Sequence, residues 1–346
     1  MSLTPVVTES RSAGELLAWG REMIETPLRD AVLGLPEVAR TVVGYHFGWW
    51  DRHGRPVNGK RGKALRPTLL LLSASAVGGR PEELTRVAAA VELVHNFSLV
   101  HDDVMDGDRT RHHRSTVWHV FGVDQAILAG DAMLALATSL VAACAGPPAA
   151  LAVEWLSRCV VRLCEGQYGD LGFERREDVT LPECLDMVAG KTAALLECSC
   201  ALGALLAGAG DHRVDLLRAF GRDLGVAFQL VDDLLGIWGD SAVTGKPVGA
   251  DLARRKKTLP VVAALASGTA EGGELSALYH GAGLLTPAQV TRAAELVEAA
   301  GGRAWARAET TARLAAASAH LDAVGCAPRA SAELLALIEF VTRRDC

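Results

Sequence analysis

The chain has 346 residues, of which 50% are apolar, 22% are charged and 5% are aromatic. So large an apolar fraction excludes an intrinsically disordered chain and supplies enough material for a large core. The formal net charge of -6 argues against a protein that binds nucleic acid by electrostatic attraction.

Apolar residues recur at helical spacing along most of the chain. One such series runs from Leu84 to Val94, and another runs from Leu216 to Val231. Pro81, and Pro287 after Thr286, mark helix starts. Glycine-rich breaks are short, and no linker separates two domains. We therefore predict one all-α domain over residues 1–346, a single large bundle of about a dozen helices.

Several features predict a cytoplasmic protein without a membrane span. The eight cysteines form no C-x-x-C pair, so we expect buried, reduced thiols. Residues 1–25 mix charged and apolar side chains and resemble neither a signal peptide nor a transit peptide. The most apolar stretch, residues 192–210, contains Glu197, and we expect a buried core helix there. We expect exposed polar loops at residues 51–62 and 240–257.

An acidic cluster closes the helix that begins near Pro81. Asp102 and Asp106 are four residues apart and so share a helix face, with Asp103 beside them. Carboxylates at a helix C-terminus oppose the helix dipole, so a positive partner is expected. Magnesium takes carboxylate oxygens and keeps waters that phosphate can replace. Alone, this cluster would fit a solvated helix end equally well.

A second acidic cluster favours a shared site. Gln229, Asp232 and Asp233 fall close to one face near the end of another long apolar helix. If the two helix ends converge, their carboxylates form a multi-metal diphosphate site. Basic side chains accompany both clusters, as expected for a phosphorylated substrate. They are Lys63, Arg66, Arg109, Arg111, Arg114, Lys246, Arg254, Arg255, Lys256 and Lys257.

In their order along the chain, these motifs resemble those of the trans-isoprenyl diphosphate synthases, also called polyprenyl synthetases. The resemblance covers the chain from about Gly59 to Val341. The matching segments are Gly62-Lys63-x-x-Arg66, Glu92-Leu93-Val94-His95, Asp102-Asp103-x-x-Asp106, Ala126 to Asp131, Gly166-Gln167-x-x-Asp170-Leu171, Lys191-Thr192, Gln229 with Asp232-Asp233, and Lys246 with Lys256.

The resemblance implies an isoprenoid synthase fold around a central cavity, a homodimer and a magnesium-dependent prenyltransferase that uses three metal ions. Metal ligands would be Asp102, Asp106 and Asp232. Lys63, Arg66, His95 and His112 would bind isopentenyl diphosphate. Allylic diphosphate would be bound by Arg111, Lys191, Thr192, Gln229, Lys246 and Lys256. Among these residues, Asp102, Asp106, Arg111, Lys191, Gln229 and Asp232 would take part in catalysis: allylic ionisation, condensation and loss of a proton.

Product length should depend on the side chains that precede Asp102. Phe97 is bulky and lies five positions earlier, and Ser98 is small and lies four positions earlier. In the family this combination resembles a stop near twenty carbons. We therefore expect geranylgeranyl diphosphate, with farnesyl diphosphate as the alternative. The alternative is that Phe97 is an ordinary core residue and does not limit product length.

Two positions depart from the family pattern. The second of two adjacent arginines after the first acidic motif is replaced by His112, which cannot make a two-pronged guanidinium contact. Gly236 stands where the second acidic motif usually has its third aspartate, and Asp240 is no obvious substitute. The first change bears on isopentenyl diphosphate binding, and the second bears on the metal count.

Two other functions fit parts of the pattern. A class I terpene cyclase also ionises an allylic diphosphate on an all-α fold, but it would not need Lys63, Arg66 and His95 for a second diphosphate. A non-catalytic subunit would keep the fold for partner binding. Such subunits tend to lose an acidic motif, whereas here the first is intact and the second keeps its leading pair.

Overall fold

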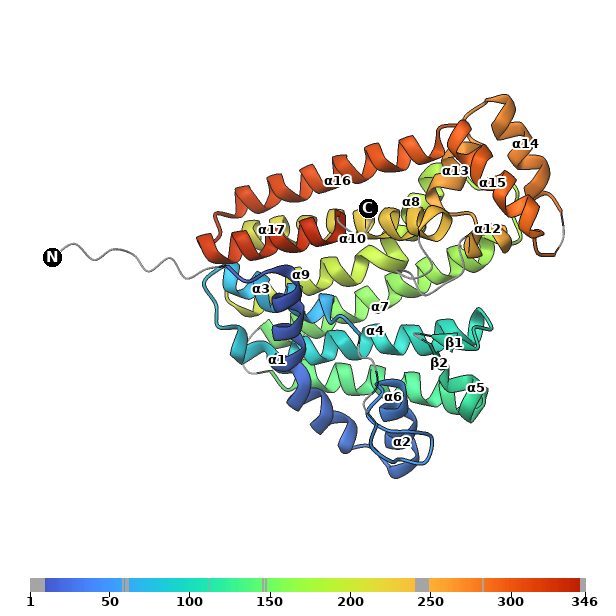
Figure 1. The fold of residues 1–346 in the computed structure, drawn as a ribbon. Helices are drawn as coiled ribbons and strands as arrows, with labels where there is room; N and C mark the ends of the chain where they lie inside the picture. Colours follow the sequence, from blue (N-terminus) through green and yellow to red (C-terminus); the bar gives the residue numbers. More distant parts are fainter. Residues whose placement is uncertain are drawn as a thin grey trace. The chain divides into compact units, whose positions relative to one another are not determined.

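The computed structural model describes residues 10–57, 59, 62–111, 113–144, 146, 148–239, 249–281 and 283–342. These residues are almost entirely helical (Figure 1), which confirms the predicted all-α class. The α-helices are α1 (Ala13–Leu33), α2 (Glu37–His46), α3 (Leu65–Ala76), α4 (Thr85–Met105), α5 (Val117–Phe121), α6 (Val123–Ala142), α7 (Pro148–Phe173), α8 (Leu181–Val188), α9 (Ala194–Leu206), α10 (Asp211–Trp238), α12 (Ala250–Ala253), α13 (Leu259–Leu265), α14 (Ala270–Tyr279), α15 (Pro287–Ala299), α16 (Gly302–Val324) and α17 (Pro328–Thr342).

Three further elements are short. A 3-10 turn, η1 (Pro81–Leu84), precedes α4, and a π-helical segment, η2 (Ala189–Ala193), joins α8 to α9. A hairpin follows α4, in which β1 (Thr110–Arg111) pairs antiparallel with β2 (Arg114–Ser115). Neither the hairpin nor the π segment is predicted by the periodicity of the sequence, because each is too short to change it.

The chain divides into two compact units, each drawn from separate stretches of sequence. Unit 1 comprises Met1–Arg158, Cys198–Arg218 and Leu321–Leu337. Unit 2 comprises Cys159–Glu197, Ala219–His320 and Ile338–Cys346. A single domain with a central cavity stays a prediction.

In unit 1, α4 is the central element. It lies side by side with α6 and also packs against α1 and α3 (Figure 1). Val87, Val91 and Val94 are completely buried, as the helical series predicted. The helix proper begins at Thr85 rather than Pro81, because Pro81 opens the 3-10 turn that leads into it. This packing fixes the end of α4, where the first acidic motif lies.

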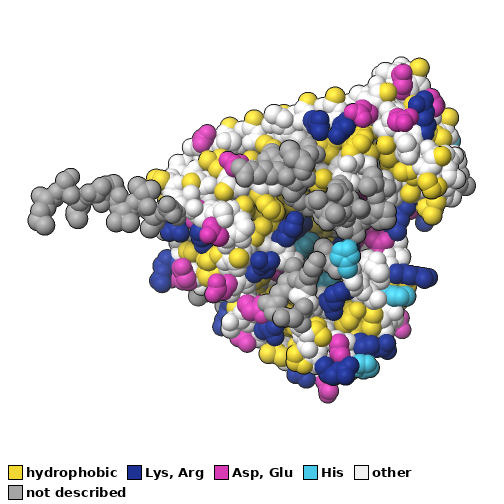
Figure 2. All heavy atoms as spheres, viewed as in Figure 1, with side chains coloured by type: hydrophobic (Ala, Val, Ile, Leu, Met, Phe, Trp, Pro, Cys, Tyr) yellow, Lys and Arg dark blue, Asp and Glu magenta, His cyan; other side chains and the backbone are white. Residues whose placement is uncertain are grey.

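In unit 2, α13 packs against α8, α14 and α15. The predicted start at Pro287 is confirmed: Thr286 caps α15, and its hydroxyl accepts a hydrogen bond from the backbone N–H of Gln289. Basic and acidic side chains lie close together near α14 and α15 (Figure 2), where Arg292 pairs with Glu274 at 2.7 Å. These are surface contacts, and the predicted site lies on other elements.

The predicted loop at residues 240–257 was partly wrong. Residues 240–248, with Lys246 and Asp240, lie outside the described part of the chain. After them, Ala250–Ala253 forms α12, and Lys256 is half-buried rather than exposed. The other predicted loop is exposed from residue 52 to residue 57.

Two segments are long and apolar enough to cross a bilayer, judged by length and composition alone. They are α6 and the continuous segment Leu181–Leu206, and 33% and 67% of their most apolar windows are buried in the protein. The second overlaps the predicted core helix at residues 192–210. The sequence prediction did not single out α6. The described cysteines are free thiols as expected, but Cys164 is exposed.

Candidate active site

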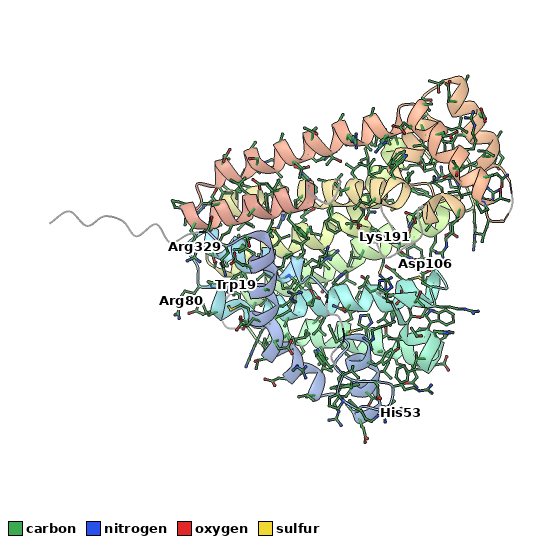
Figure 3. All side chains as sticks on the ribbon, in the orientation of Figure 1. Trp19, His53, Arg80, Asp106, Lys191 and Arg329 are labelled. Atoms are coloured by element: carbon green, nitrogen blue, oxygen red, sulfur yellow. The ribbon has the colours of Figure 1, made fainter. Side chains whose placement is uncertain are left out.

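The first acidic motif occupies the last turn of α4. Asp102 and Asp106 are both half-buried, and the backbone N–H of Asp106 donates to the carbonyl of Asp102 at 2.8 Å. Figure 3 labels Asp106 at the end of this helix. The predicted shared face of Asp102 and Asp106 therefore exists, at the point where α4 stops.

Asp103 differs from its two neighbours. Its side chain is 2% exposed, and Arg111 holds it through Nε and through the NH2 group, each 2.8 Å from Oδ1. Burial raises the pKa of the Asp103 carboxyl, and the Arg111 guanidinium opposes that rise. Arg111 reaches Asp103 because the β1–β2 hairpin follows the helix directly. A guanidinium carries five N–H donors, so this pair leaves donors for a phosphate.

The end of α4 fits a hard cation that is shared with a phosphate. Asp102 and Asp106 offer oxygen ligands one helical turn apart, while Asp103 is committed to Arg111. Among the described residues, no three His, Cys, Asp or Glu side chains gather into a complete metal site. A magnesium ion that keeps waters and takes phosphate oxygens needs only one or two protein carboxylates, so the two aspartates suffice.

Two of the four residues predicted for isopentenyl diphosphate, Arg66 and His95, lie together in unit 1. Arg66, in the first turn of α3, has its NH1 group 3.2 Å from Nε2 of His95 on α4. Lys63, three residues before Arg66, is exposed. His112 lies outside the described residues. The structure thus joins Arg66 to His95 across two helices, as the predicted site requires.

A buried polar chain that the sequence did not predict lies behind this pair. Asn96 donates to Oε1 of Glu92 at 3.1 Å, and Nε2 of His46 lies 2.8 Å from Oδ1 of Asn96. Burial raises the pKa of Glu92, and the nearby Arg66 guanidinium opposes that rise. These hydrogen-bonded side chains link α2 to the turn of α4 that carries His95. Only Glu92 had a signal in the sequence, as a charged residue in an apolar helical run.

In unit 2, a half-buried carboxylate joins two of the predicted substrate-binding lysines. Oδ2 of Asp170 on α7 accepts from Nζ of Lys191 at 2.5 Å and from Nζ of Lys256 at 3.3 Å. Burial raises the pKa of Asp170, but the ammonium groups of Lys256 and Lys191 outweigh it and hold the pKa below its usual value. Lys191 lies in the π segment and is labelled in Figure 3.

Close helix crossings position this cluster. A Cβ added to Gly166 on α7 would lie 2.2 Å from the backbone N of Lys191, and one added to Gly225 on α10 would lie 2.5 Å from Cα of Ala193. Both glycines therefore let a helix backbone touch the π segment. Asp170 lies one turn after Gly166, and Gln229 lies one turn after Gly225, so each crossing brings a polar side chain to the segment.

A second chain of hydrogen bonds runs through the other motif residues. The Thr192 hydroxyl donates to Oε1 of Gln229 at 2.7 Å, and Nε2 of Gln229 donates to Oδ1 of Asp233 at 2.8 Å. Oδ2 of Asp233 accepts from the backbone N–H of Leu259 at 3.0 Å. Burial raises the pKa of Asp233 to about 7. With both oxygens bonded inside the protein, Asp233 serves structure, and its half-buried neighbour Asp232 is the better cation ligand.

The predicted chain-length residues lie on the last turns of α4. Phe97 is buried, and its ring makes an edge contact with His101 at a centroid distance of 5.2 Å. The Ser98 hydroxyl donates to the carbonyl of His95 at 2.9 Å. The residues predicted for ionisation divide between unit 1 (Asp102, Asp106, Arg111) and unit 2 (Lys191, Gln229, Asp232), and their convergence stays a prediction.

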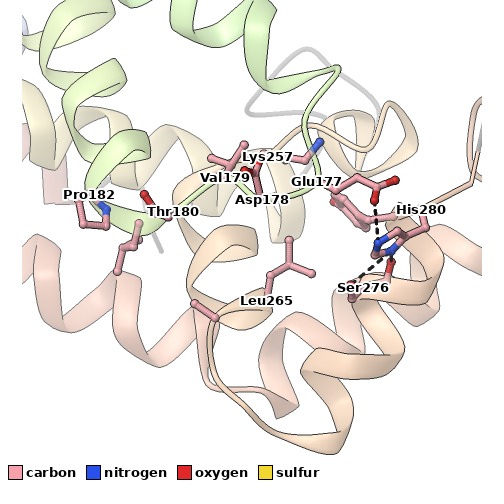
Figure 4. A pocket seen from close by; sticks show the side chains of 12 residues that line it. Glu177, Asp178, Val179, Thr180, Pro182, Lys257, Leu265, Ser276 and His280 are labelled. Atoms are coloured by element: carbon pink, nitrogen blue, oxygen red, sulfur yellow. Dashed lines mark hydrogen bonds and ion pairs between the residues drawn. The ribbon is translucent and has the colours of Figure 1, made fainter.

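A cavity of about 450 Å³ lies elsewhere in unit 2 (Figure 4). Its walls include Glu177, Lys257 and Tyr279. Lys257 belongs to the basic run after the second acidic motif, but the walls contain none of the residues that the family resemblance assigns to substrate or metal. His280 at its edge pairs with Glu177 at 3.1 Å. This cavity is distinct from the predicted site.

Comparisons with known proteins agree with the motifs. The sequence model described as "Polyprenyl synthetase" matches residues 50–297. A geranylgeranyl diphosphate synthase of Mycobacterium tuberculosis is 48% identical over 321 residues, which are 92% of this chain and 90% of the relative. A (2E,6E)-farnesyl diphosphate synthase of the same species is 46% identical over 333 residues, which are 95% of this chain and 93% of the relative.

Solved structures give the same result. A polyprenyl synthetase from Streptomyces coelicolor superposes with a TM-score of 0.90 at 44% identity, covering 94% of this chain and 98% of that one. A geranylgeranyl pyrophosphate synthetase from Pyrococcus horikoshii superposes with a TM-score of 0.84 at 32% identity, covering 94% of this chain and 98% of that one. The chain therefore belongs to the polyprenyl synthetase family and is a trans-prenyltransferase.

Proposed function

We propose that the chain condenses an allylic diphosphate with isopentenyl diphosphate and that its main product is geranylgeranyl diphosphate. The allylic C–O bond breaks, and its electron pair leaves with the diphosphate. The double bond of isopentenyl diphosphate then attacks the allylic cation, which forms a C–C bond. The released diphosphate takes the proton whose loss restores a double bond. The names of the relatives support this reaction over terpene cyclisation and over a non-catalytic role.

Each cluster has a defined task in this reaction. Arg66 and His95, with Lys63, hold the isopentenyl diphosphate head group. Lys191 and Lys256, with Arg111 and Lys246, stabilise the departing anion by charge placed before the reaction begins. The hydrogen bond from Thr192 and the one to Asp233 fix the Gln229 amide dipole, which faces the developing cation. His112 is the residue at which isopentenyl diphosphate binding departs from the family pattern.

We propose that Asp102, Asp106 and Asp232 hold magnesium, in three ions as the resemblance implies. When bound there, the metal would supply Lewis-acid charge to the diphosphate leaving group. Asp103 supports this arrangement indirectly, because its ion pair orients Arg111 toward the end of α4. Gly236 in place of a third aspartate leaves Asp232 as the metal ligand of the second motif.

The product assignment depends on Phe97. The side chain is 8% exposed and lies five residues before Asp102, about 7.5 Å along the helix axis. A growing chain anchored by its diphosphate at Asp102 and Asp106 would extend back along α4 and meet this ring. The relatives include both a farnesyl and a geranylgeranyl diphosphate synthase, so overall similarity does not decide between the products.

Replacing Phe97 with Ala is expected to lengthen the product. The wild type, given magnesium, isopentenyl diphosphate and each allylic primer in turn, should stop at twenty carbons, and F97A should make longer chains because the stop is removed. Chromatography of the dephosphorylated products measures the change. F121A, which removes a half-buried ring on α5, should leave the length unaltered. An unchanged product from F97A would remove Phe97 from the site.

We propose that the chain forms a homodimer through α6. This helix leaves large apolar side chains exposed: Val123 by 43%, Ile127 by 43% and Leu128 by 59%. Exposed apolar surface of this kind marks an interaction site. A second copy of the same face can bury it symmetrically.

A charge on this face is expected to disrupt the dimer. The wild type should sediment at twice its chain mass of 36.4 kDa. L128E should sediment as a monomer, because a carboxylate would be buried at the contact. The matched control is L284E, at an apolar residue of unit 2 that is 73% exposed, and it should keep the wild-type mass. A wild type that sediments as a monomer would contradict the proposal.

We also propose a cytoplasmic location, which the free cysteines support. After cell lysis and centrifugation the protein should stay in the supernatant. Recovery in the membrane fraction would instead assign α6 or the segment Leu181–Leu206 to a bilayer.

A further inference from the structure

We propose that Asp170 is a positioning residue that holds Lys191 and Lys256 as a paired cation for the allylic diphosphate. This inference rests on the proposed function, because that function makes the two lysines ligands of the leaving group. The sequence placed Asp170 in a motif but gave it no task. In the structure, this single carboxylate touches two predicted substrate-binding groups.

Both lysines contact the same oxygen atom of Asp170. Oδ2 of Asp170 accepts from both ammonium groups, at 2.5 Å from Lys191 and 3.3 Å from Lys256. The Asp170 side chain is 12% exposed, whereas Lys191 is 22% and Lys256 is 40% exposed. The carboxylate therefore belongs to the least exposed of the three side chains.

The hydrogen-bond donors of the lysines also favour a role in binding an anion. The two ammonium groups share one carboxylate oxygen of Asp170. Each ammonium group has three N–H donors and gives one to Asp170, so both lysines can also donate to the oxygens of a diphosphate. Asp170 keeps the lysines together before the diphosphate arrives, since the two ammonium groups otherwise repel each other.

The three partners come from segments that local sequence does not connect. Asp170 lies on α7, Lys191 in the π segment and Lys256 in the loop after α12. Asp170 and Lys256 are 86 residues apart. Gly166, one turn before Asp170, brings α7 against the backbone of Lys191, so the carboxylate is held at a fixed place. A lysine ammonium group sits on a flexible four-carbon stem, so without a partner it occupies many positions. The Asp170 carboxylate restricts both ammonium groups to one position each.

Asp170→Asn should lower kcat far more than it changes KM. The net positive charge remains, so we expect KM for the allylic diphosphate to stay within about threefold, because ground-state attraction does not require exact placement. Stabilising the leaving group does require that the two ammonium groups are held in fixed positions. We therefore expect kcat to fall roughly 10- to 100-fold, as when a residue that orients a ligand-binding side chain is removed. D170E, which keeps the charge on a longer arm, should recover part of the lost kcat.

Two further variants separate positioning from fold stability. D170N/K191M/K256M should be little slower than K191M/K256M, because Asp170 acts through the two lysines that are already missing. Asp186→Asn is the matched control: Asp186 pairs with Arg162 at 2.9 Å on the exposed side of α8, and its loss should leave kcat unchanged. If D170N only lowers the unfolding temperature and keeps kcat, Asp170 is structural and the proposal fails.

Lysine acylation tests the same idea without turnover. Mass spectrometry of protein treated with acetic anhydride reports the reactivity of Lys191 and Lys256. Both should react slowly in the wild type, faster in D170N, and more slowly again in wild type with inorganic pyrophosphate. Equal rates in wild type and D170N would overturn the role of Asp170. A wild type without prenyl transfer but with this labelling pattern would contradict the proposed function alone.

Discussion

Replacing Asp102 with Asn is expected to lower kcat by about 1000-fold, the upper range for losing one preorganised charge contact at a reacting centre. The amide keeps the shape of the side chain but removes the negative charge that a hard cation requires. Asp103 cannot take over, because it is 2% exposed and committed to Arg111 at 2.8 Å. The sequence shows two adjacent aspartates, and only the structure separates their tasks.

Steady-state kinetics at saturating magnesium and both substrates measure this effect. Asp322→Asn is the control: this aspartate lies exposed near the end of α16, and its replacement should leave kcat within about twofold, as for most surface changes. Circular dichroism should show equal helix content in all three proteins. A D102N enzyme that keeps more than a tenth of the wild-type kcat would remove Asp102 from the metal site.

The helices were predictable because burial and period coincide. On α4 the residues spaced by three and four are buried, and the same spacing places Asp102 and Asp106 on one face. Helix starts with a cap and a proline, such as Thr286 and Pro287, could also be read directly. Periodicity and capping residues predicted the helices correctly where neighbouring residues in the sequence determine the structure.

The site could be predicted only as a set of residue types. Lys256 belongs to a charged run that resembles an exposed loop, and it is half-buried because of Asp170, 86 residues earlier. The Arg111–Asp103 pair depends on a hairpin with two residues in each strand, too short to give a pattern. The π segment has the sequence Ala-Gly-Lys-Thr-Ala, which carries no pattern that marks a π-helix. In each case the cause is a contact between distant segments, which periodicity does not contain.

Gly166 illustrates the same limit, because a glycine inside a helical run has several meanings. Gly166 and Gly172 both lie in α7. A Cβ at Gly172 meets nothing within 4 Å, whereas a Cβ at Gly166 would lie 2.2 Å from the backbone N and 2.7 Å from Cα of Lys191. From the sequence alone, we would expect replacement of either glycine by alanine to stabilise the helix. From the structure, we expect alanine to stabilise the protein at Gly172 and to destabilise it at Gly166.

Gly166→Ala should destabilise the protein by about 3 kcal/mol, at the upper end for overpacking, because the atoms it meets are backbone and cannot rotate away. Relief of the contact would move α7 from the π segment and separate Asp170 from Lys191, so kcat should fall as well. Gly172→Ala should keep kcat and raise stability by about 0.5 kcal/mol, since alanine loses less backbone entropy than glycine. Thermal unfolding and steady-state kinetics of both variants measure the contrast. If G166A unfolds at the wild-type temperature with full activity, α7 does not touch the π segment at Gly166, and the crossing that positions Asp170 is wrong.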